Sequence, residues 1–199
     1  HALADVVPSA REALRGGHGR IGLAPVTHAI VVVVDGLGLD LLRRNRGHAR
    51  TLAARLDTDP AIGSVFPTTT ASALATLTTG RSPGEHGLVG YTAYDPDSDA
   101  VVRLLDGWRP DGGPLDPASW QLVPTQFELM AADGIVSAAV CGARYLGSGF
   151  TAAVLRGAEF RGAASLDERI GIARDELRLP GPRLVYFYLS ELDYEGHNR

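Results

Sequence analysis

Short apolar runs alternate along the chain with stretches in which apolar side chains recur at helical spacing. The run at residues 28–34 is continuous and rich in valine and isoleucine, which is typical of a parallel strand covered on both faces. Three further runs predict strands at 62–66, 135–141 and 184–192, and the last of these has the composition of a buried strand.

The segments between these runs favour helices. Apolar spacing predicts them over residues 39–55, 70–79, 125–133 and 166–177, and a short amphipathic piece at 10–14 precedes them. Gly80 stands where a glycine commonly ends a helix in the left-handed conformation. Strands that alternate with helices predict an α/β fold, a mostly parallel sheet with helices on both faces. Sheets of this kind bind ligands beyond the carboxyl ends of their strands.

The length of 199 residues fits one domain, which we expect to extend over 1–199. Within it, residues 81–124 are rich in glycine, proline, aspartate and aromatic residues. A connection of that length in a compact domain is typically functional. We therefore expect a loop or lid insertion at about 81–124.

The composition excludes several functional classes. The net charge is −4, and the 19 cationic residues are all arginines without a basic stripe, so we expect no nucleic-acid polymer as a partner. The absence of lysine rules out a Walker-type phosphate loop and Schiff-base chemistry. The apolar runs are far shorter than the roughly 20 residues of a membrane-spanning helix, so we expect no membrane partner.

The single cysteine, Cys141, allows no internal disulfide and no cysteine zinc site. The apolar residues around it predict a buried and inert thiol, which agrees with a cytoplasmic location. The chain opens with His1 rather than methionine, so removal of a leader is compatible with the sequence.

Three segments carry side chains that are suited to chemistry. Asp35 follows the run at 28–34, threonines 68–70 open a predicted helix, and Asp193 and His197 follow the last apolar run. Each has a plainer explanation, namely an Asp-Gly turn, a helix cap and a solvated surface pair. Together, a carboxylate, a hydroxyl, a second carboxylate and an imidazole after strand ends suggest a metal-assisted hydrolase.

A threonine hydroxyl becomes a nucleophile only when a base or a metal activates it. The nearby histidine is His86, and its setting in Arg-Ser-Pro-Gly-Glu-His-Gly indicates a structured turn rather than a base. A metal is the better activator. Asp193 and His197, spaced i and i+4, offer the oxygen and nitrogen ligands that suit Zn²⁺ or a similar transition metal.

These motifs, in this order, resemble those of the alkaline phosphatase superfamily, and specifically its type I phosphodiesterase/nucleotide pyrophosphatase branch. The resemblance covers most of 28–199 and implies an alkaline-phosphatase-like fold. The stretches that carry it are Val-Val-Asp35-Gly, Phe66-Pro-Thr-Thr-Thr70 with Thr-Gly80, Ser-Pro-Gly-Glu-His86-Gly and Asp193-Tyr-Glu-Gly-His197.

The resemblance also implies a ligand set and a mechanism. Two divalent metal ions, with Zn²⁺ as the first candidate, would lie at the carboxyl end of the sheet. By resemblance, Asp35 and Thr70 bind one ion, and Asp193 and His197 bind the other. The spacing in the family pattern places the nucleophile at Thr70, which would form a phospho-threonine intermediate.

The chain departs from the family pattern at two points. Where the pattern has an asparagine that hydrogen-bonds a phosphate oxygen, the chain has Tyr91, whose phenol would make a similar bond to the substrate. The chain also stops at Arg199, before the Asp-His pair and the later histidine that complete the family's metal ligands. We therefore expect an α/β domain that is incomplete at the C-terminus, the first part of a longer enzyme.

The resulting prediction is a metal-dependent phosphodiesterase or nucleotide pyrophosphatase that acts on a small-molecule phosphate ester. One alternative is a phosphomonoesterase or phosphonate hydrolase with the same core. A sulfatase fits less well, because that branch needs a cysteine or serine where the chain has Thr70. The other alternative is a non-catalytic fragment or degenerate binding domain. The sequence leaves the substrate, the working ion and the oligomeric state open.

Overall fold

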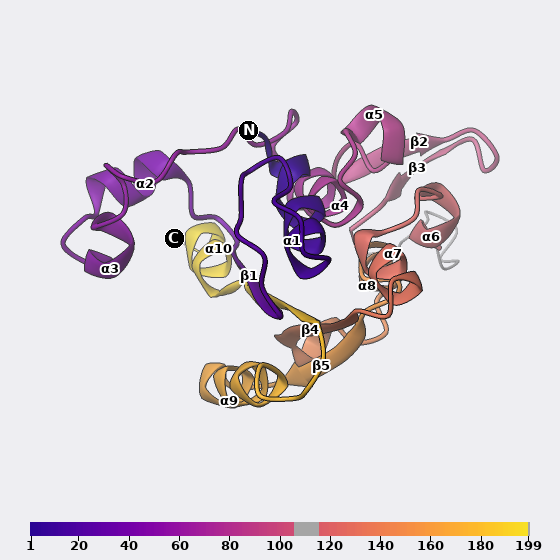
Figure 1. Ribbon diagram of the computed structural model, residues 1–199. Coiled ribbons are helices and arrows are strands. Elements are labelled where there is room, and N and C mark those ends of the chain that lie inside the picture. Colours follow the sequence, from indigo (N-terminus) through magenta and orange to yellow (C-terminus); the bar gives the residue numbers. More distant parts are fainter. Residues whose placement is uncertain (106–115, 199) are drawn as a thin grey trace.

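The computed structural model describes residues 1–105 and 116–198. Its centre is a four-stranded parallel sheet in the order β1–β6–β4–β5 (Figure 1). Strands β1 and β6 are paired along their whole length, so that Val34 lies opposite Leu189 and their carboxyl ends lie side by side. The strands are β1 (His28–Val34), β4 (Val136–Gly142), β5 (Glu159–Ala163) and β6 (Arg183–Leu189).

One face of the sheet carries the larger core. Helices α1 (Val6–Leu14), α4 (Thr70–Thr79) and α7 (Gln126–Ala132) cover this face (Figure 1). Phe127 is fully buried there, and its ring meets the ring of Tyr186 edge-on at 5.9 Å. Alternate residues of β6 point into this core, as the two-residue period of a strand requires.

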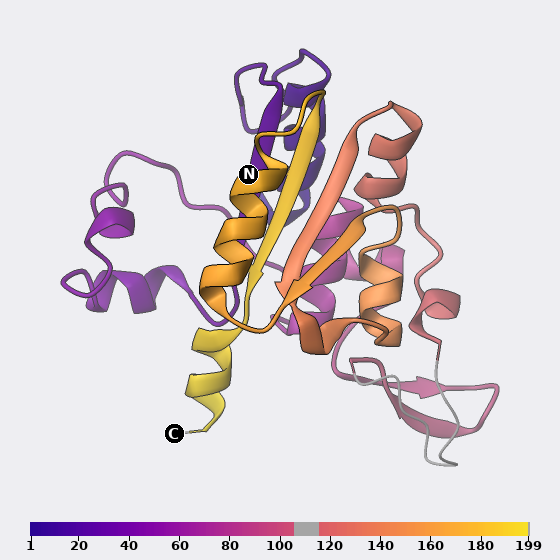
Figure 2. The same ribbon diagram turned by 90° about the horizontal axis from the view of Figure 1, so that it is seen from below.

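The opposite face packs on one helix, α9 (Leu166–Glu176), which lies along the sheet in Figure 2. Val140, Val185 and Phe187 form the core beneath it together with Ala173 of the helix. Helices on both faces of a mostly parallel sheet confirm the predicted α/β class.

A third cluster joins α4 to α8 (Gly149–Val154) and to the described part of 81–124. That part holds two short helices, α5 (Pro83–His86) and α6 (Pro117–Trp120), and a hairpin of β2 (Thr92–Asp95) and β3 (Ala100–Arg103). The predicted insertion at about 81–124 also includes residues 106–115, which lie outside the described residues.

Several elements agree closely with the sequence-based expectation. Strand β1 and helix α4 have the predicted bounds, and Gly80 ends α4 at a φ of +70° with its N–H on the Thr76 carbonyl. The predicted helices at 125–133 and 166–177 are α7 and α9, and the predicted strand at 135–141 is β4.

Other expectations were wrong. The predicted helix at 39–55 is two short helices, α2 (Leu39–Arg44) and α3 (Arg50–Ala53). The first ends at Asn45, whose side-chain amide donates to the Leu41 carbonyl. The predicted strand at 62–66 is extended chain with a single bridge, from Gly63 to Ala2. Its backbone meets no neighbouring strand beyond that bridge in the described part of the chain.

The predicted strand at 184–192 ends at Leu189, and a helix, α10 (Glu191–His197), follows at once. Figure 2 shows α10 beyond the carboxyl ends of the strands. Sequence periodicity did not identify β5, α8 or the hairpin, whose segments are short and have mixed polarity. Among the described residues, no helix combines the length and apolar character needed to cross a membrane.

The expectation that β1 is covered on both faces was also wrong. Ile30 and Val32 are 45% and 53% exposed. Strand β1 is at the edge of the sheet, and α9 packs mainly on β4, β5 and β6. Within the described residues, one face of β1 is therefore open to solvent.

Candidate active site

The site is at the carboxyl edge of the sheet, where β1 and β6 end together. Asp35 directly follows β1, and its N–H donates to the Leu189 carbonyl at the end of β6 at 2.8 Å. Helix α10 then carries Asp193 and His197, one turn apart. Two segments separated by more than 150 residues thus deliver their carboxylates to one edge, as the sequence predicted.

Gly36 allows this close approach. It has a φ of +77°, in the left-handed region that favours glycine, and a Cβ at this position would lie 3.0 Å from the Cα of Asp193. The turn after β1 therefore packs directly against the backbone of α10. This contact holds the backbone next to Asp35 close to the backbone of Asp193.

The Asp35 carboxylate is held by three donors. Oδ1 accepts the Gly36 N–H at 3.0 Å, and Oδ2 accepts the Tyr188 phenol at 2.6 Å and the Thr70 hydroxyl at 3.4 Å. Burial and the contact with Asp35 raise the pKa of Tyr188, so the phenol stays protonated and donates. Sequence reasoning missed Tyr188. Its signal was a tyrosine with a polar tip near the carboxyl end of a strand that was expected to be buried.

The three threonines before α4 have three different roles. Thr68 donates to the Val65 carbonyl at 2.7 Å, and Thr69 is the N-cap, its hydroxyl accepting the Ser72 N–H at 3.3 Å. The cap explanation therefore applies to Thr69. Thr70 is the first residue of α4, and its hydroxyl is the one that reaches Asp35.

Asp193 and His197 form the second pair. Oδ1 of Asp193 lies 3.5 Å from Nε2 of His197, and the imidazole is 81% exposed. The segment that carries both residues is helical, and it presents the carboxylate and the imidazole on one face.

Two cavities adjoin these pairs. One has a volume of about 510 Å³ and the other about 1060 Å³. Tyr91, the predicted substrate-binding residue, lines the larger cavity and is 41% exposed. Both cavities are lined by the same four predicted site residues, Asp35, Thr70, Asp193 and His197.

The donor chemistry of these residues fits divalent metal ions in part. Asp35 with Thr70 offers two oxygens, and Asp193 with His197 offers an oxygen and a nitrogen, all of them zinc or hard-cation ligands. Zn²⁺ usually takes four ligands. Among residues 1–105 and 116–198, no three histidine, cysteine, aspartate or glutamate side chains are grouped to hold an ion. The described chain therefore supplies half of each expected ligand set.

Cys141 and His86 are structural residues. Burial raises the pKa of the Cys141 thiol to about 12, which agrees with the predicted inert thiol. His86 ends α5 and is 1% exposed, with Nδ1 accepting the Leu88 N–H at 3.2 Å and Nε2 facing the Thr76 hydroxyl at 2.9 Å. The neutral imidazole is thus bonded on both sides, as a structured turn requires.

We expect His86 to make folding stability depend on pH. Burial lowers its pKa from 6.5 to about 4, so the unfolded chain binds a proton in this range while the folded chain does not. Stability is therefore complete above pH 6.5 and falls as the pH drops, by about 3 kcal/mol at pH 4. Urea unfolding at pH 4.5–7.5 measures this slope. It is expected to flatten in His86→Gln and to persist in a control at exposed His48, His48→Gln. An equal slope in all three proteins would contradict the assignment.

The sheet with helices on both faces, and the hydroxyl and carboxylates at its carboxyl edge, agree with the alkaline-phosphatase-like class that the sequence motifs resemble. Within that class, the chain belongs to the type I phosphodiesterase / nucleotide pyrophosphatase family, whose model matches residues 29–199. No curated protein sequence matches the chain significantly.

Solved structures support the fold. Murine ectonucleotide pyrophosphatase / phosphodiesterase 5 is 21% identical with a TM-score of 0.60, and an inactive threonine-to-alanine variant of it in complex with AMP is 20% identical with the same TM-score. Both matches cover 85% of this chain. The human protein is 18% identical with a TM-score of 0.56 over 84% of this chain. The chain spans 44% of the length of these three structures.

Proposed function

We propose that the protein is a metal-dependent phosphodiesterase or nucleotide pyrophosphatase with Thr70 as its nucleophile. The observation that carries the proposal is the 3.4 Å contact between the Thr70 hydroxyl and the Asp35 carboxylate at the start of α4. The hydroxyl, both carboxylates and the imidazole of His197 also line the same two cavities. Membership of the family supports a phosphoric ester hydrolase.

In this mechanism the Thr70 hydroxyl gives its proton to solvent, and its oxygen attacks phosphorus in line with the leaving oxygen. The P–O bond to the leaving group breaks, its electron pair goes to that oxygen, and the phosphoryl group stays on Thr70. Water then attacks the phospho-threonine and releases the phosphate product with the free hydroxyl. The first turn of α4 begins at Thr70, so its backbone N–H groups are placed to stabilise a phosphoryl oxygen.

Two divalent ions, for which Zn²⁺ is our first candidate, would lower the pKa of the attacking hydroxyl and stabilise the leaving oxygen when bound. Asp35 and Thr70 would hold one ion, and Asp193 and His197 the other, each with further ligands. Gly36 contributes by packing the first pair against the helix that carries the second. Tyr188 contributes by fixing the rotamer of Asp35 through its hydrogen bond.

A nucleotide-like ester is the substrate class that we favour. A related solved structure is a complex with AMP, and the larger cavity has room for a nucleotide beside Thr70. Tyr91 lines that cavity and would donate its phenol to a phosphate oxygen.

Metal removal tests the proposal. Full-length protein is treated with a chelator, and hydrolysis of bis(4-nitrophenyl) phosphate is followed with elemental analysis of bound zinc. We expect about two zinc ions per chain before treatment, at least about a hundredfold loss of turnover after it, and recovery when Zn²⁺ is returned. The monoester 4-nitrophenyl phosphate, assayed in parallel, distinguishes a phosphomonoesterase. Turnover that survives chelation would contradict the metal-dependent mechanism.

A non-catalytic binding domain is the second candidate. The specific observation behind it is that each pair of ligands in the described residues is only half of a zinc site. This candidate predicts no stoichiometric metal and no turnover in the full-length protein, so the same experiment decides between the two.

A further inference from the structure

The smaller cavity, of about 510 Å³, extends from Asp35 and Thr70 between α4 and α8. Its walls on that side include the apolar Leu74, Phe150 and Val154. Arg144 is the only arginine among the described residues that line it. It belongs to the short helix η2 (Ala143–Tyr145), which directly follows the carboxyl end of β4. A full positive charge therefore borders an apolar cavity that begins at the proposed nucleophile.

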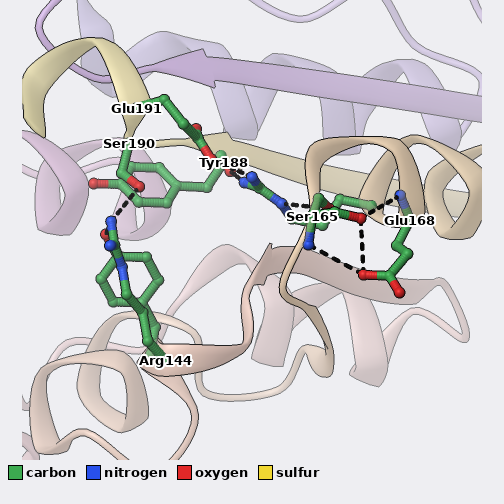
Figure 3. A network of polar contacts seen from close by, with 8 residues as sticks. Arg144, Ser165, Glu168, Tyr188, Ser190 and Glu191 are labelled. Carbon is green, nitrogen blue, oxygen red and sulfur yellow. Dashed lines mark hydrogen bonds and ion pairs between the residues drawn. The ribbon is translucent and has the colours of Figure 1, made fainter. Parts of the chain in front are cut away.

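Neutral groups hold this guanidinium in place. Its Nη2 donates to the Tyr145 phenol oxygen at 2.9 Å. The same nitrogen donates to the Ser190 hydroxyl at 3.0 Å (Figure 3). The guanidinium carbon lies 4.9 Å from the ring centre of Tyr145 and 5.7 Å from that of Tyr194. Such contacts fix the direction of an arginine without neutralising it.

In the described part of the chain, no carboxylate forms an ion pair with Arg144, although the charge of Glu191 helps to raise the pKa of the guanidinium. The direct ion pair of Glu191, on α10, is with the buried Arg169, which also donates to the Tyr188 carbonyl. Two of the three guanidinium nitrogens of Arg144, Nε and Nη1, have no acceptor among the described residues. An oriented arginine with free donors is suited to bind an oxyanion.

We propose that Arg144 binds an anionic group on the part of the ester that enters the smaller cavity. The inference rests on the proposed function, because it takes the scissile phosphate to lie at Thr70. The preferred substrate is then a phosphate ester with an apolar or aromatic body that ends in a carboxylate or phosphoryl group. Arg144 acts as a specificity residue, while the apolar walls receive the body of the substituent.

Paired synthetic esters test this preference in full-length protein with zinc. Phenyl 4-nitrophenyl phosphate is compared with its analogues that carry a carboxylate or a phosphonate at the para position of the phenyl ring. We expect kcat/KM for the anionic esters to exceed that for the neutral ester, and Arg144→Met to lower this ratio about tenfold, mainly through KM. The two analogues show which anion is preferred. Arg144→Lys keeps a charge without the fork and is expected to retain part of the ratio.

Arg178→Met is the matched control, because Arg178 is 69% exposed after α9 and pairs with the exposed Asp175. It should leave the ratio unchanged. Since Arg144 also bonds Ser190, its loss can lower turnover of every ester, and the ratio cancels that effect. A ratio near one in the native protein, or one that Arg144→Met does not change, would overturn the inference.

Failure of the proposed function is separable from failure of this inference. If the proposed function fails, the protein does not hydrolyse even the neutral ester. In that case, calorimetric binding of the neutral and anionic esters to Thr70→Ala protein, with and without Arg144→Met, gives the same ratio without catalysis. A preference for the anionic ester that disappears with Arg144 supports the inference, and equal binding of both esters overturns it.

Discussion

Replacing Thr70 with alanine is expected to lower kcat for phosphate-diester hydrolysis by at least about a thousandfold. Its hydroxyl is the only one of the three neighbouring threonine hydroxyls that bonds Asp35. Because the cap of α4 is Thr69, the loss of Thr70 removes the nucleophile without removing the cap. Steady-state kinetics with bis(4-nitrophenyl) phosphate and a thermal unfolding curve measure the two effects together. Activity is expected to disappear while the unfolding temperature changes little.

The neighbouring threonines supply matched controls. Thr69→Ala removes the cap and is expected to cost about 1 kcal/mol of stability while turnover stays within several-fold of the native value. Thr70→Ser keeps a hydroxyl at the same place and should retain measurable turnover. If Thr70→Ala hydrolyses the diester at the native rate, another residue is the nucleophile, and the proposed phospho-threonine is wrong.

Local sequence was sufficient for the elements that hold these groups. The bounds of β1 and α4 and the end of α4 at Gly80 followed from apolar spacing and glycine chemistry. The positions of Asp35 and Asp193 at neighbouring strand ends followed from the parallel sheet, because parallel strands present their carboxyl ends at one edge. These features depend on short-range pattern and on a general rule of sheet topology.

Other features depend on contacts that no local pattern records. Three consecutive threonines have the same local composition, and only the direction of each hydroxyl in the structure shows that Thr69 caps the helix while Thr70 reaches Asp35. The phenol of Tyr188 meets Asp35 because β1 and β6 are neighbours. The hydrogen bonds of Arg144 to Tyr145 and Ser190 depend on how η2 lies against the start of α10. Strand β1 has the composition of a strand that is buried on both faces, yet Val32 is exposed. Whether a face of the strand is buried depends on which other elements pack against it.

Glu176 is expected to be among the most sensitive positions for stability. It is the last residue of α9, and its two carboxylate oxygens bond Arg161 of β5 at 3.0 Å and Arg183 of β6 at 2.8 Å. The side chains of Glu176 and Arg183 are 8% and 10% exposed. Glu176→Ala leaves a buried guanidinium without its counter-charge, which costs about 3–5 kcal/mol. The midpoint of urea unfolding, at unchanged slope, measures this loss.

A neighbouring acidic residue on the same helix is the control. Asp175 is 75% exposed and pairs with Arg178 at 3.5 Å, so Asp175→Ala is expected to change stability by less than about 1 kcal/mol. Adding Arg183→Met to Glu176→Leu should recover much of the loss, because replacing both members of a buried pair with apolar groups is often neutral. A double-mutant cycle then gives the coupling energy. The ion pair joins the end of α9 to the first residue of β6, the strand that precedes α10. A small effect of Glu176→Ala would mean that the pair adds little to the packing of α9.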